Sequence, residues 1–320
     1  MPNHLTAEPA WLIGTGNMAR QYVKVLQALG VEFRVIGNSQ KSVDAFASDT
    51  GIEPFQGGLD AFLRQTADVP PFAINTVQSQ HLSACTRSLI QHGVKKILSE
   101  KPAGRTQEEL DLTAEMAKAQ GAEVFVAYNR RFYASTIAAR RIIEEDGGVT
   151  SMHFEFTELY RVISRQTGDV SKWFFGNASH VLDLAFYLGG LPDTMQCYAK
   201  GNIEGYTSNV IFSGAGVSQT GALFSYQANW LSPGRWSVEV LTSKHRLIFR
   251  PMETLQIQQL GSFSIEPYPI DDDLDKAYKP GLYMQVRTFI EHPEDDRFLR
   301  IEAQAEHFRH YQTIYSGIHR

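Results

Sequence analysis

The chain has 320 residues, of which 43% are hydrophobic and 20% are charged, so it is long enough for two folded domains and is not a disordered protein. Its 30 basic and 35 acidic residues give a formal net charge of −5, and the scattered basic residues argue against a nucleic-acid-binding surface. Two cysteines are present, and the sequence shows no basic-then-apolar leader and no long apolar stretch. We therefore expect a cytoplasmic protein without a disulfide framework, a metal site or a membrane segment.

A short apolar stretch, Ala10–Ile13, runs into a glycine turn and then into a helical pattern of apolar residues. Gly14 permits the tight turn, Gly16 lets the backbone approach a phosphate group, and Ala19 lets the helix pack on its strand, as in a dinucleotide-binding fingerprint. A tight turn that binds no ligand is the alternative. The residues expected to face a pyrophosphate are Gly14, Thr15, Gly16, Asn17 and Met18.

The first 127 residues alternate apolar strands with helices. After the first strand, we expect further strands at 33–36, 72–77, 96–99 and 124–127. Helices are expected at 43–49, 59–64, 81–92 and 106–120, the last opened by a Thr106/Glu109 capping box. This alternation predicts a Rossmann fold, an α/β doubly wound parallel sheet with helices on both faces. Ligands of such a sheet lie beyond the carboxyl ends of its strands, so Thr76, His81 and Glu100 are expected beside the glycine turn.

The pattern changes near Asn129. After a helix at 134–145, period-two alternation predicts strands at 152–159, 195–200, 210–213, 222–229, 236–242 and 245–250. Helices are expected at 180–188, 283–291 and 301–316, and the acidic run 271–275 is expected to be a solvated loop rather than a metal site. We therefore predict a dinucleotide-binding domain of residues 1–127 and an α+β domain of residues 128–320 with a large, mostly antiparallel sheet.

The stretch Ser99-Glu-Lys-Pro102 lies at the end of the predicted strand 96–99, where a parallel sheet presents catalytic groups. Pro102 restricts the backbone before it, which can aim Lys101 across the crevice. A lysine there could exchange the proton of a substrate hydroxyl while hydride leaves the same carbon. The alternative is a surface lysine paired with Glu100.

Four short motifs, in this order and spacing, resemble the glucose-fructose oxidoreductase, inositol dehydrogenase and MocA (Gfo/Idh/MocA) family. They are Gly14-Thr-Gly-Asn-Met-Ala19, Ser99-Glu-Lys-Pro102, Tyr128-Asn-Arg-Arg-Phe132 and Gly176-Asn-Ala-Ser-His-Val-Leu-Asp183. The resemblance implies an NAD(P)-dependent oxidoreductase of sugars and polyols, with Lys101 near the reacting carbon and His180 assisting it. It also implies that His81 lies near the nicotinamide and that the sheet of the second domain is used for homo-oligomerisation.

Two positions depart from the family's pattern. Gly176 stands where many relatives carry an aspartate, so a relay through lysine, aspartate and histidine is incomplete, and Val77 replaces a usual proline. Asp183 shares a helical face with His180 and could orient it or meet a substrate hydroxyl. A helix cap or a core hydrogen bond is the alternative for Asp183, and a core histidine is the alternative for His180.

The end of the second strand bears on the choice of cofactor. Gly37 occupies the position where an acidic residue would bind the ribose hydroxyls of NAD. Asn38 and Ser39 can donate to a phosphate, and Lys41 adds positive charge. We therefore expect NADP to be preferred, with NAD still possible. These polar residues could instead cap the following helix.

The segment that precedes His180 offers possible contacts to a sugar in Tyr160, Arg161 and Trp173. Core or interface positions are the alternative for these residues. The sequence thus predicts hydride transfer between a nicotinamide cofactor and a sugar, polyol or nucleotide-linked sugar. Two further hypotheses are a non-catalytic NADP(H)-binding sensor or assembly protein, and a reductase of a non-sugar carbonyl or imine.

Overall fold

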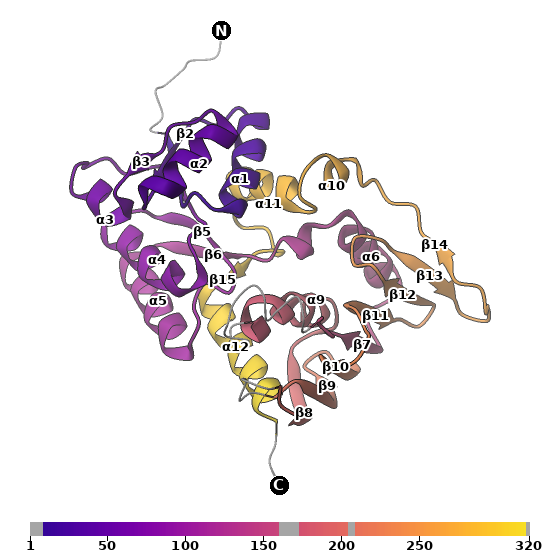
Figure 1. The fold of residues 1–320 in the computed structure, drawn as a ribbon. Coiled ribbons are helices and arrows are strands. Elements are labelled where there is room, and N and C mark those ends of the chain that lie inside the picture. Colours follow the sequence, from indigo (N-terminus) through magenta and orange to yellow (C-terminus); the bar gives the residue numbers. More distant parts are fainter. Residues whose placement is uncertain (1–8, 160–172, 204–208, 318–320) are drawn as a thin grey trace. The chain divides into compact units, whose positions relative to one another are not determined.

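The computed structural model describes residues 9–159, 173–203 and 209–317, and the chain divides into two compact units (Figure 1). The first unit contains the chain up to Tyr128 together with Leu282–Ala305, and the second contains Asn129–Gly281 and the chain from Glu306 onward. This division lies one residue from the expected boundary after residue 127. Residues 282–305, expected in the second domain, lie in the first unit because they add a strand to its sheet and a helix to its surface.

The first unit is built on a seven-stranded sheet with the order β15-β6-β5-β4-β1-β2-β3. Its strands are β1 (Ala10–Ile13), β2 (Phe33–Gly37), β3 (Phe55–Gln56), β4 (Ala73–Asn75), β5 (Lys96–Glu100), β6 (Glu123–Ala127) and β15 (Leu299–Arg300). Strands β1 to β6 run parallel, and β15 pairs antiparallel with β6. The prediction of a doubly wound parallel sheet is confirmed, with two short edge strands, β3 and β15, that the sequence did not indicate.

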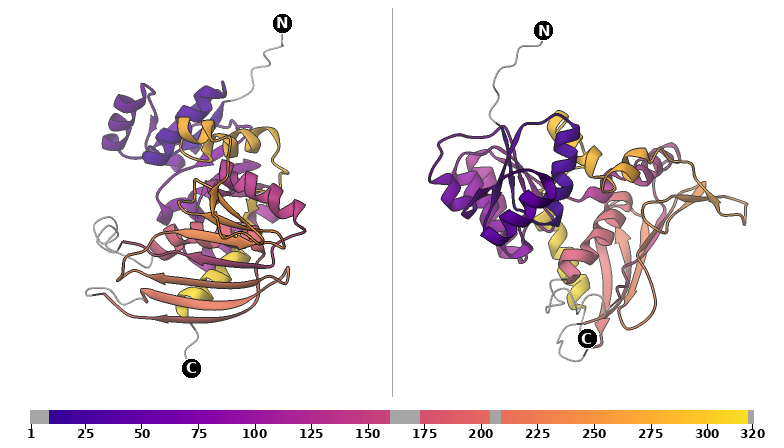
Figure 2. Two further views of the ribbon diagram at one scale, coloured as in Figure 1. Left: turned by 90° about the vertical axis from the view of Figure 1, so that its right-hand side faces the viewer. Right: turned by 45° about the horizontal axis from the view of Figure 1, so that its top comes forward.

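Helices lie on both faces of this sheet (Figure 2). They are α1 (Asn17–Ala28), α2 (Gln40–Thr50), α3 (Gly58–Leu63), α4 (Leu82–Gln91), α5 (Gln107–Gln120), α11 (Leu282–Glu291) and the start of α12 (Ile301–Ser316). Because both faces are covered, all four residues of β1 are buried. At the start of α5, the Thr106 hydroxyl accepts from the Glu109 amide, whereas the Glu109 carboxylate binds the amide of Arg105 rather than that of Thr106.

The second unit contains an eight-stranded sheet with the order β14-β13-β12-β11-β7-β10-β9-β8. Its strands are β7 (Ser151–Glu155), β8 (Pro192–Lys200), β9 (Ile211–Ser218), β10 (Leu223–Asn229), β11 (Ser237–Leu241), β12 (His245–Phe249), β13 (Gln256–Gln259) and β14 (Glu266–Pro267). Strands β7 and β10 run parallel, and the other neighbours pair antiparallel. The predicted, mostly antiparallel sheet is therefore confirmed.

Helical segments complete the second unit. They are η2 (Asn129–Phe132), α6 (Ala134–Glu145), η3 (Phe174–Ala178), α9 (Ser179–Gly189), α10 (Asp273–Ala277) and the end of α12. Helix α9 packs on β7 and β11, where Phe154 of β7 stacks with Tyr226 and meets Phe186 of α9 edge to face. These rings form an aromatic core on one face of the sheet.

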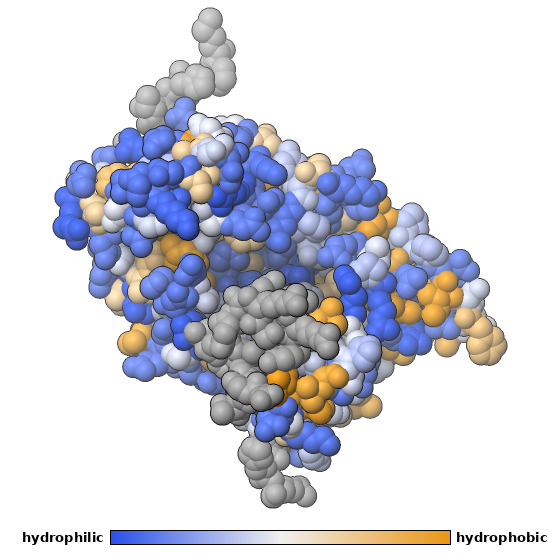
Figure 3. All heavy atoms as spheres, in the orientation of Figure 1, coloured by the Kyte–Doolittle hydropathy of each residue, from blue (hydrophilic) through white to orange (hydrophobic). Residues whose placement is uncertain are grey.

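Two features of the second unit differ from the sequence-based expectations. The last three residues of the acidic run 271–275 belong to helix α10, and the Asp275 carboxylate accepts from the amides of Ala134 and Gly281, at 2.9 and 2.7 Å. Strands β13 and β14 were not predicted, and the turn between them carries the fully exposed Phe263. Figure 3 shows apolar residues at the end of this hairpin.

Within the described ranges, no cluster of three or more histidine, cysteine, aspartate or glutamate side chains is arranged to hold a metal ion. None of the helices described by the structure is long and apolar enough to span a membrane.

Candidate functional site

The glycine turn after β1 lies at the carboxyl end of the first sheet. Gly14 has a φ of +111°, and a Cβ atom there would lie 2.7 Å from Oγ1 of Thr76. The amide and the hydroxyl of Thr76 both donate to the carbonyl of Ile13, each at 2.8 Å, which ties the ends of β1 and β4 together. Glycine is therefore required at position 14 by conformation and by packing.

The start of helix α1 has the properties of an anion site. No side chain caps this helix, and its first turn contains no acidic residue. A Cβ atom at Gly16 would meet nothing within 4 Å, and Gly16 and Asn17 are exposed. The Arg20 guanidinium donates to the carbonyl of Thr15 at 3.0 Å and so holds the turn. The uncapped helix start and the open space at Gly16 fit the pyrophosphate of a dinucleotide.

Packing explains the glycine at the end of β2, Gly37. A Cβ atom at Gly37 would lie 2.6 Å from Cγ2 of Val43 and 2.9 Å from Cγ2 of Thr15. The residues that follow, including Asn38 and Lys41, are exposed. Ser39 caps α2 by accepting from the Ser42 amide at 3.3 Å.

Lys101 is half-buried and follows β5 in a turn that is held from two sides. The Tyr22 hydroxyl of α1 donates to Glu100 at 2.9 Å, and burial together with this carboxylate raises the pKa of Tyr22. On the other side, the buried Gln304 amide of α12 donates to the carbonyl of Pro102 at 3.1 Å. Glu100 is thus bound to the helix that starts at the glycine turn, and Lys101 lies between two anchored neighbours.

The loop after β4 carries Thr76 and His81. Asn75 is buried, and its side-chain amide donates to the Leu82 carbonyl at 3.0 Å while its oxygen accepts from the Val77 amide at 3.4 Å. A proline at position 77 has no amide hydrogen for this contact, so valine allows it. His81 is exposed and immediately precedes α4.

In the second unit, His180 and Asp183 of α9 have different surroundings. His180 is 7% exposed, and its ring centroid lies 6.1 Å from that of Trp236. Asp183 is completely buried and binds Arg131 through two hydrogen bonds of 2.9 and 2.6 Å. Burial opposes the charge of Arg131, but the carboxylate outweighs it and raises the pKa of the guanidinium. This is the core contact that was the alternative for Asp183.

A pocket of about 360 Å³ lies near His180 within the second unit and is lined by Glu158 and Arg130. The Glu158 carboxylate accepts from the side-chain amide of Asn177 at 2.7 Å and from the indole of Trp236 at 2.9 Å. Burial raises the pKa of Glu158 to about 7, although these hydrogen bonds and the charge of Arg130 oppose the shift. The pocket therefore contains a carboxyl group that titrates near neutrality.

The sequence did not single out these pocket residues. Arg130 belongs to the motif 128–132, but nothing in the motif distinguishes it from Arg131. Glu158 comes three residues after β7 and carries no motif of its own. Of the predicted sugar contacts, Trp173 is half-buried just before η3, and Tyr160 and Arg161 lie outside the described residues.

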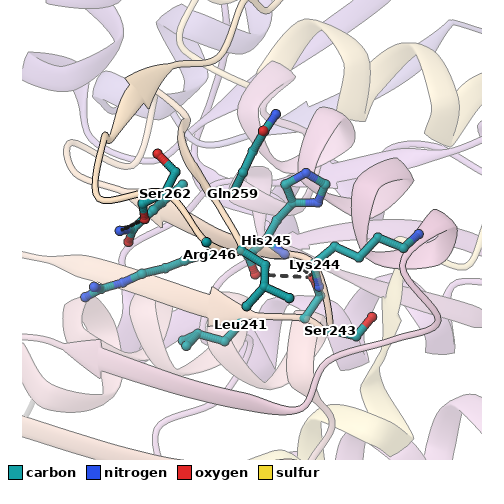
Figure 4. Close-up of a pocket in the computed structure, with 11 residues that line it drawn as sticks. Leu241, Ser243, Lys244, His245, Arg246, Gln259 and Ser262 are labelled. Carbon is teal, nitrogen blue, oxygen red and sulfur yellow. Dashed lines mark hydrogen bonds between the residues drawn. The ribbon is translucent and has the colours of Figure 1, made fainter.

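A second pocket, of about 270 Å³, lies between the β11–β12 hairpin and β13 (Figure 4). Figure 4 shows Lys244 and Arg246 extending away from each other. Both cations are used for structure, since Lys244 pairs with Asp146 and Arg246 pairs with Glu239. The first pair connects the β11–β12 turn to Asp146 at the end of α6, and the second lies within the hairpin.

Several solved structures share this fold. UDP-N-acetylglucosamine 3-dehydrogenase GnnA from Acidithiobacillus ferrooxidans has a TM-score of 0.77 at 15% identity, covering 97% of each chain. The WlbA dehydrogenase from Bordetella pertussis, in complex with NADH and UDP-GlcNAcA, has a TM-score of 0.73 at 17% identity, covering 97% of this chain and 96% of that one. A putative NADPH-dependent oxidoreductase from Desulfitobacterium hafniense has a TM-score of 0.78 at 14% identity, covering 99% and 96%.

The sequence itself connects the first unit to a family. A search of curated proteins gives no match. Residues 10–128, which contain the glycine turn and the Lys101 loop, match a family model described as an oxidoreductase family with an NAD-binding Rossmann fold. The resemblance to the Gfo/Idh/MocA family is therefore confirmed over residues 10–128, which contain the first two of the four motifs.

Proposed function

We propose that the protein transfers hydride between a nicotinamide cofactor and a hydroxyl- or carbonyl-bearing carbon of a sugar, polyol or nucleotide-linked sugar. The observation that carries this proposal is the uncapped start of α1 beside the open space at Gly16, within a segment that matches an NAD-binding oxidoreductase family. Two proteins of the same fold support the substrate class, since one is named as a UDP-N-acetylglucosamine 3-dehydrogenase and the other is a dehydrogenase in complex with UDP-GlcNAcA.

The cofactor would be held by residues of the first unit. Its pyrophosphate would lie on the α1 amides, its ribose near the end of β2, and its nicotinamide near the loops that follow β4 and β5. The residues assigned to it are Gly14, Thr15, Gly16, Asn17, Met18, Asn38, Ser39, Lys41, Thr76, His81 and Glu100. When bound, the nicotinamide supplies or accepts the hydride.

Lys101 would handle the proton of the reaction. In the oxidative direction its neutral amine takes the proton of the substrate hydroxyl as the carbon becomes a carbonyl, and in reduction its ammonium returns that proton. The fixed positions of Glu100 and Pro102 would restrict the lysine to one approach. The assisting role that the resemblance gives to His180 of the second unit stays a prediction.

Replacement of Lys101 tests this role. Lys101→Ala should lower turnover about 10²- to 10⁴-fold while cofactor affinity, measured by quenching of tryptophan fluorescence, stays within about twofold of the wild type. Lys118→Ala, which removes an exposed lysine from the end of α5, is the matched control and should retain full turnover. Wild-type turnover in Lys101→Ala would remove this lysine from the mechanism.

We also propose a preference for NADP(H) over NAD(H). Position 37 has no acidic side chain to repel a 2′-phosphate, and the exposed Lys41 follows one turn later. Lys41→Glu should therefore weaken NADPH binding about tenfold or more while leaving NADH binding almost unchanged. Equal effects on the two cofactors would contradict the preference.

A homo-oligomer through the face of the second sheet that lies opposite α9 is the remaining proposal. On that face, Tyr198 of β8 and Leu223 of β10 are exposed. The double variant Tyr198→Lys and Leu223→Lys should lower the mass measured by light scattering to that of the monomer. A monomeric wild-type chain would refute the proposal.

A further inference from the structure

The pocket of the second unit presents an arginine with a buried donor that the protein does not use. Arg130 lies between two aromatic rings, with its guanidinium 4.9 Å from the centroid of Trp236 and 5.8 Å from that of Tyr133. Its Nε is buried, and within residues 9–159, 173–203 and 209–317 it has no hydrogen-bond partner. Since a buried polar group is normally hydrogen-bonded, this arrangement points to an acceptor supplied by a ligand.

The same pocket places a carboxyl group beside this arginine. Glu158 is held by Asn177 and Trp236, so its position is fixed and does not depend on Arg130. The charge of Arg130 acts on Glu158, but the two side chains form no ion pair among the residues that the structure describes. The guanidinium therefore remains oriented for another acceptor.

The charged residues that line the pocket indicate the charge of the ligand it could bind. Its lining contains two arginines and two glutamates, Arg130, Arg235, Glu158 and Glu253. When Glu158 carries a proton, these four residues leave one net positive charge, which matches a monoanion. A planar guanidinium binds a carboxylate with two parallel hydrogen bonds, and a protonated carboxyl group adds an O–H donor.

We propose that this pocket binds the carboxylate group of an acidic sugar, with Arg130 as the principal donor and the Glu158 carboxyl group beside it. The inference rests on the proposed function, because it identifies the substrate as a carboxylate-bearing, hydroxylated compound. A pocket of about 360 Å³ is within the usual range for small-molecule sites.

The proposal predicts that binding is linked to proton uptake. Burial raises the pKa of Glu158 to about 7 in the unliganded protein, and a bound carboxylate would raise it further. Affinity for the anion should therefore be full when Glu158 is protonated and should fall as the pH rises above 7. Because the protonated fraction falls from about 0.9 to about 0.1 between about pH 6 and pH 8, the expected loss is about tenfold.

Calorimetric titration of the full chain with D-glucuronate, D-glucose and inorganic phosphate tests the inference without any turnover. Glucuronate should bind more tightly than the other two at about pH 6 and about tenfold more weakly at about pH 8. Glu158→Gln, which mimics the protonated carboxyl group, should bind glucuronate at both pH values as the wild type does at the lower one. Arg130→Gln should lose about tenfold or more at both.

Arg141→Gln, which removes an exposed arginine of α6, is the matched control for charge and should bind as the wild type. Tighter binding of phosphate, equal binding of glucose, or an unchanged pH dependence in Glu158→Gln would each overturn the inference. If Arg130→Gln does not fold, the pH dependence of Glu158→Gln still tests the inference. Normal glucuronate binding without hydride transfer would refute the proposed function alone, and hydride transfer without selective glucuronate binding would refute the pocket assignment alone.

Discussion

The buried pair of Arg131 and Asp183 gives the sharpest stability prediction. Their side chains are 5% and 0% exposed and share two hydrogen bonds of 2.9 and 2.6 Å. Asp183→Asn keeps the shape of the side chain but leaves the guanidinium as a buried, uncompensated charge. The nearby His307 cannot respond by giving up a proton, because burial and Arg131 lower its pKa to about 3 and it is already neutral. Loss of one partner of a buried pair costs about 3–5 kcal/mol.

The assay is thermal unfolding followed by circular dichroism. For a unit of this size, about 3–5 kcal/mol corresponds to a fall in Tm of about 6–20 °C. Asp49→Asn is the matched control, because Asp49 pairs with Arg20 at 2.7 Å but is 58% exposed. Exposed pairs contribute about 0–1 kcal/mol, so this variant should change Tm by only a few degrees.

The outcome distinguishes the two roles considered for Asp183. A structural role predicts a lower Tm, with the KM for substrate unchanged at temperatures where the variant is folded. If Asp183→Asn instead unfolded at the same temperature as Asp49→Asn while KM rose, the carboxylate would be a substrate contact and the structural argument would be refuted.

Three further outcomes follow from the geometry. Tyr22→Phe removes the donor to the buried carboxylate of Glu100 and should lower the free energy of unfolding by about 1–3 kcal/mol, measured by urea denaturation. Gly37→Ala forces a methyl group against Val43 and should cost about 1–3 kcal/mol in the same assay, whereas an unchanged urea midpoint would contradict this packing. Burial acts to raise the pKa of Asp146, but hydrogen bonds from the β11–β12 hairpin outweigh burial and lower this pKa. The ionised carboxylate therefore stabilises the fold above the unfolded pKa of about 4, and this stabilisation is lost as the pH falls through the lower pKa of the folded state. Asp146→Asn should flatten that part of the stability–pH curve, and an unchanged curve would show that the hydrogen bonds do not matter.

Local patterns in the sequence predicted most of the fold and the part of the candidate site that lies in the first unit. The glycine spacing at 14 and 16 predicted the turn after β1, and the structure shows why position 14 requires glycine. The alternation of apolar residues predicted both sheets, because strand periodicity is a property of neighbouring residues. The match of residues 10–128 to the Gfo/Idh/MocA family model agrees with the reasoning from the two motifs that it contains, 14–19 and 99–102.

Only the tertiary structure decided which partners the charged residues meet. Asp183 is bound by Arg131, which lies 52 residues away in the sequence, and Glu158 is bound by Trp236, which lies 78 residues away. A local sequence pattern carries no information about contacts over such separations. Strand β15 was missed for the same reason, because its two residues become a strand by pairing with β6. Helix and strand depend on local periodicity, whereas the pKa of a carboxyl group depends on burial and on the charges that folding brings to it.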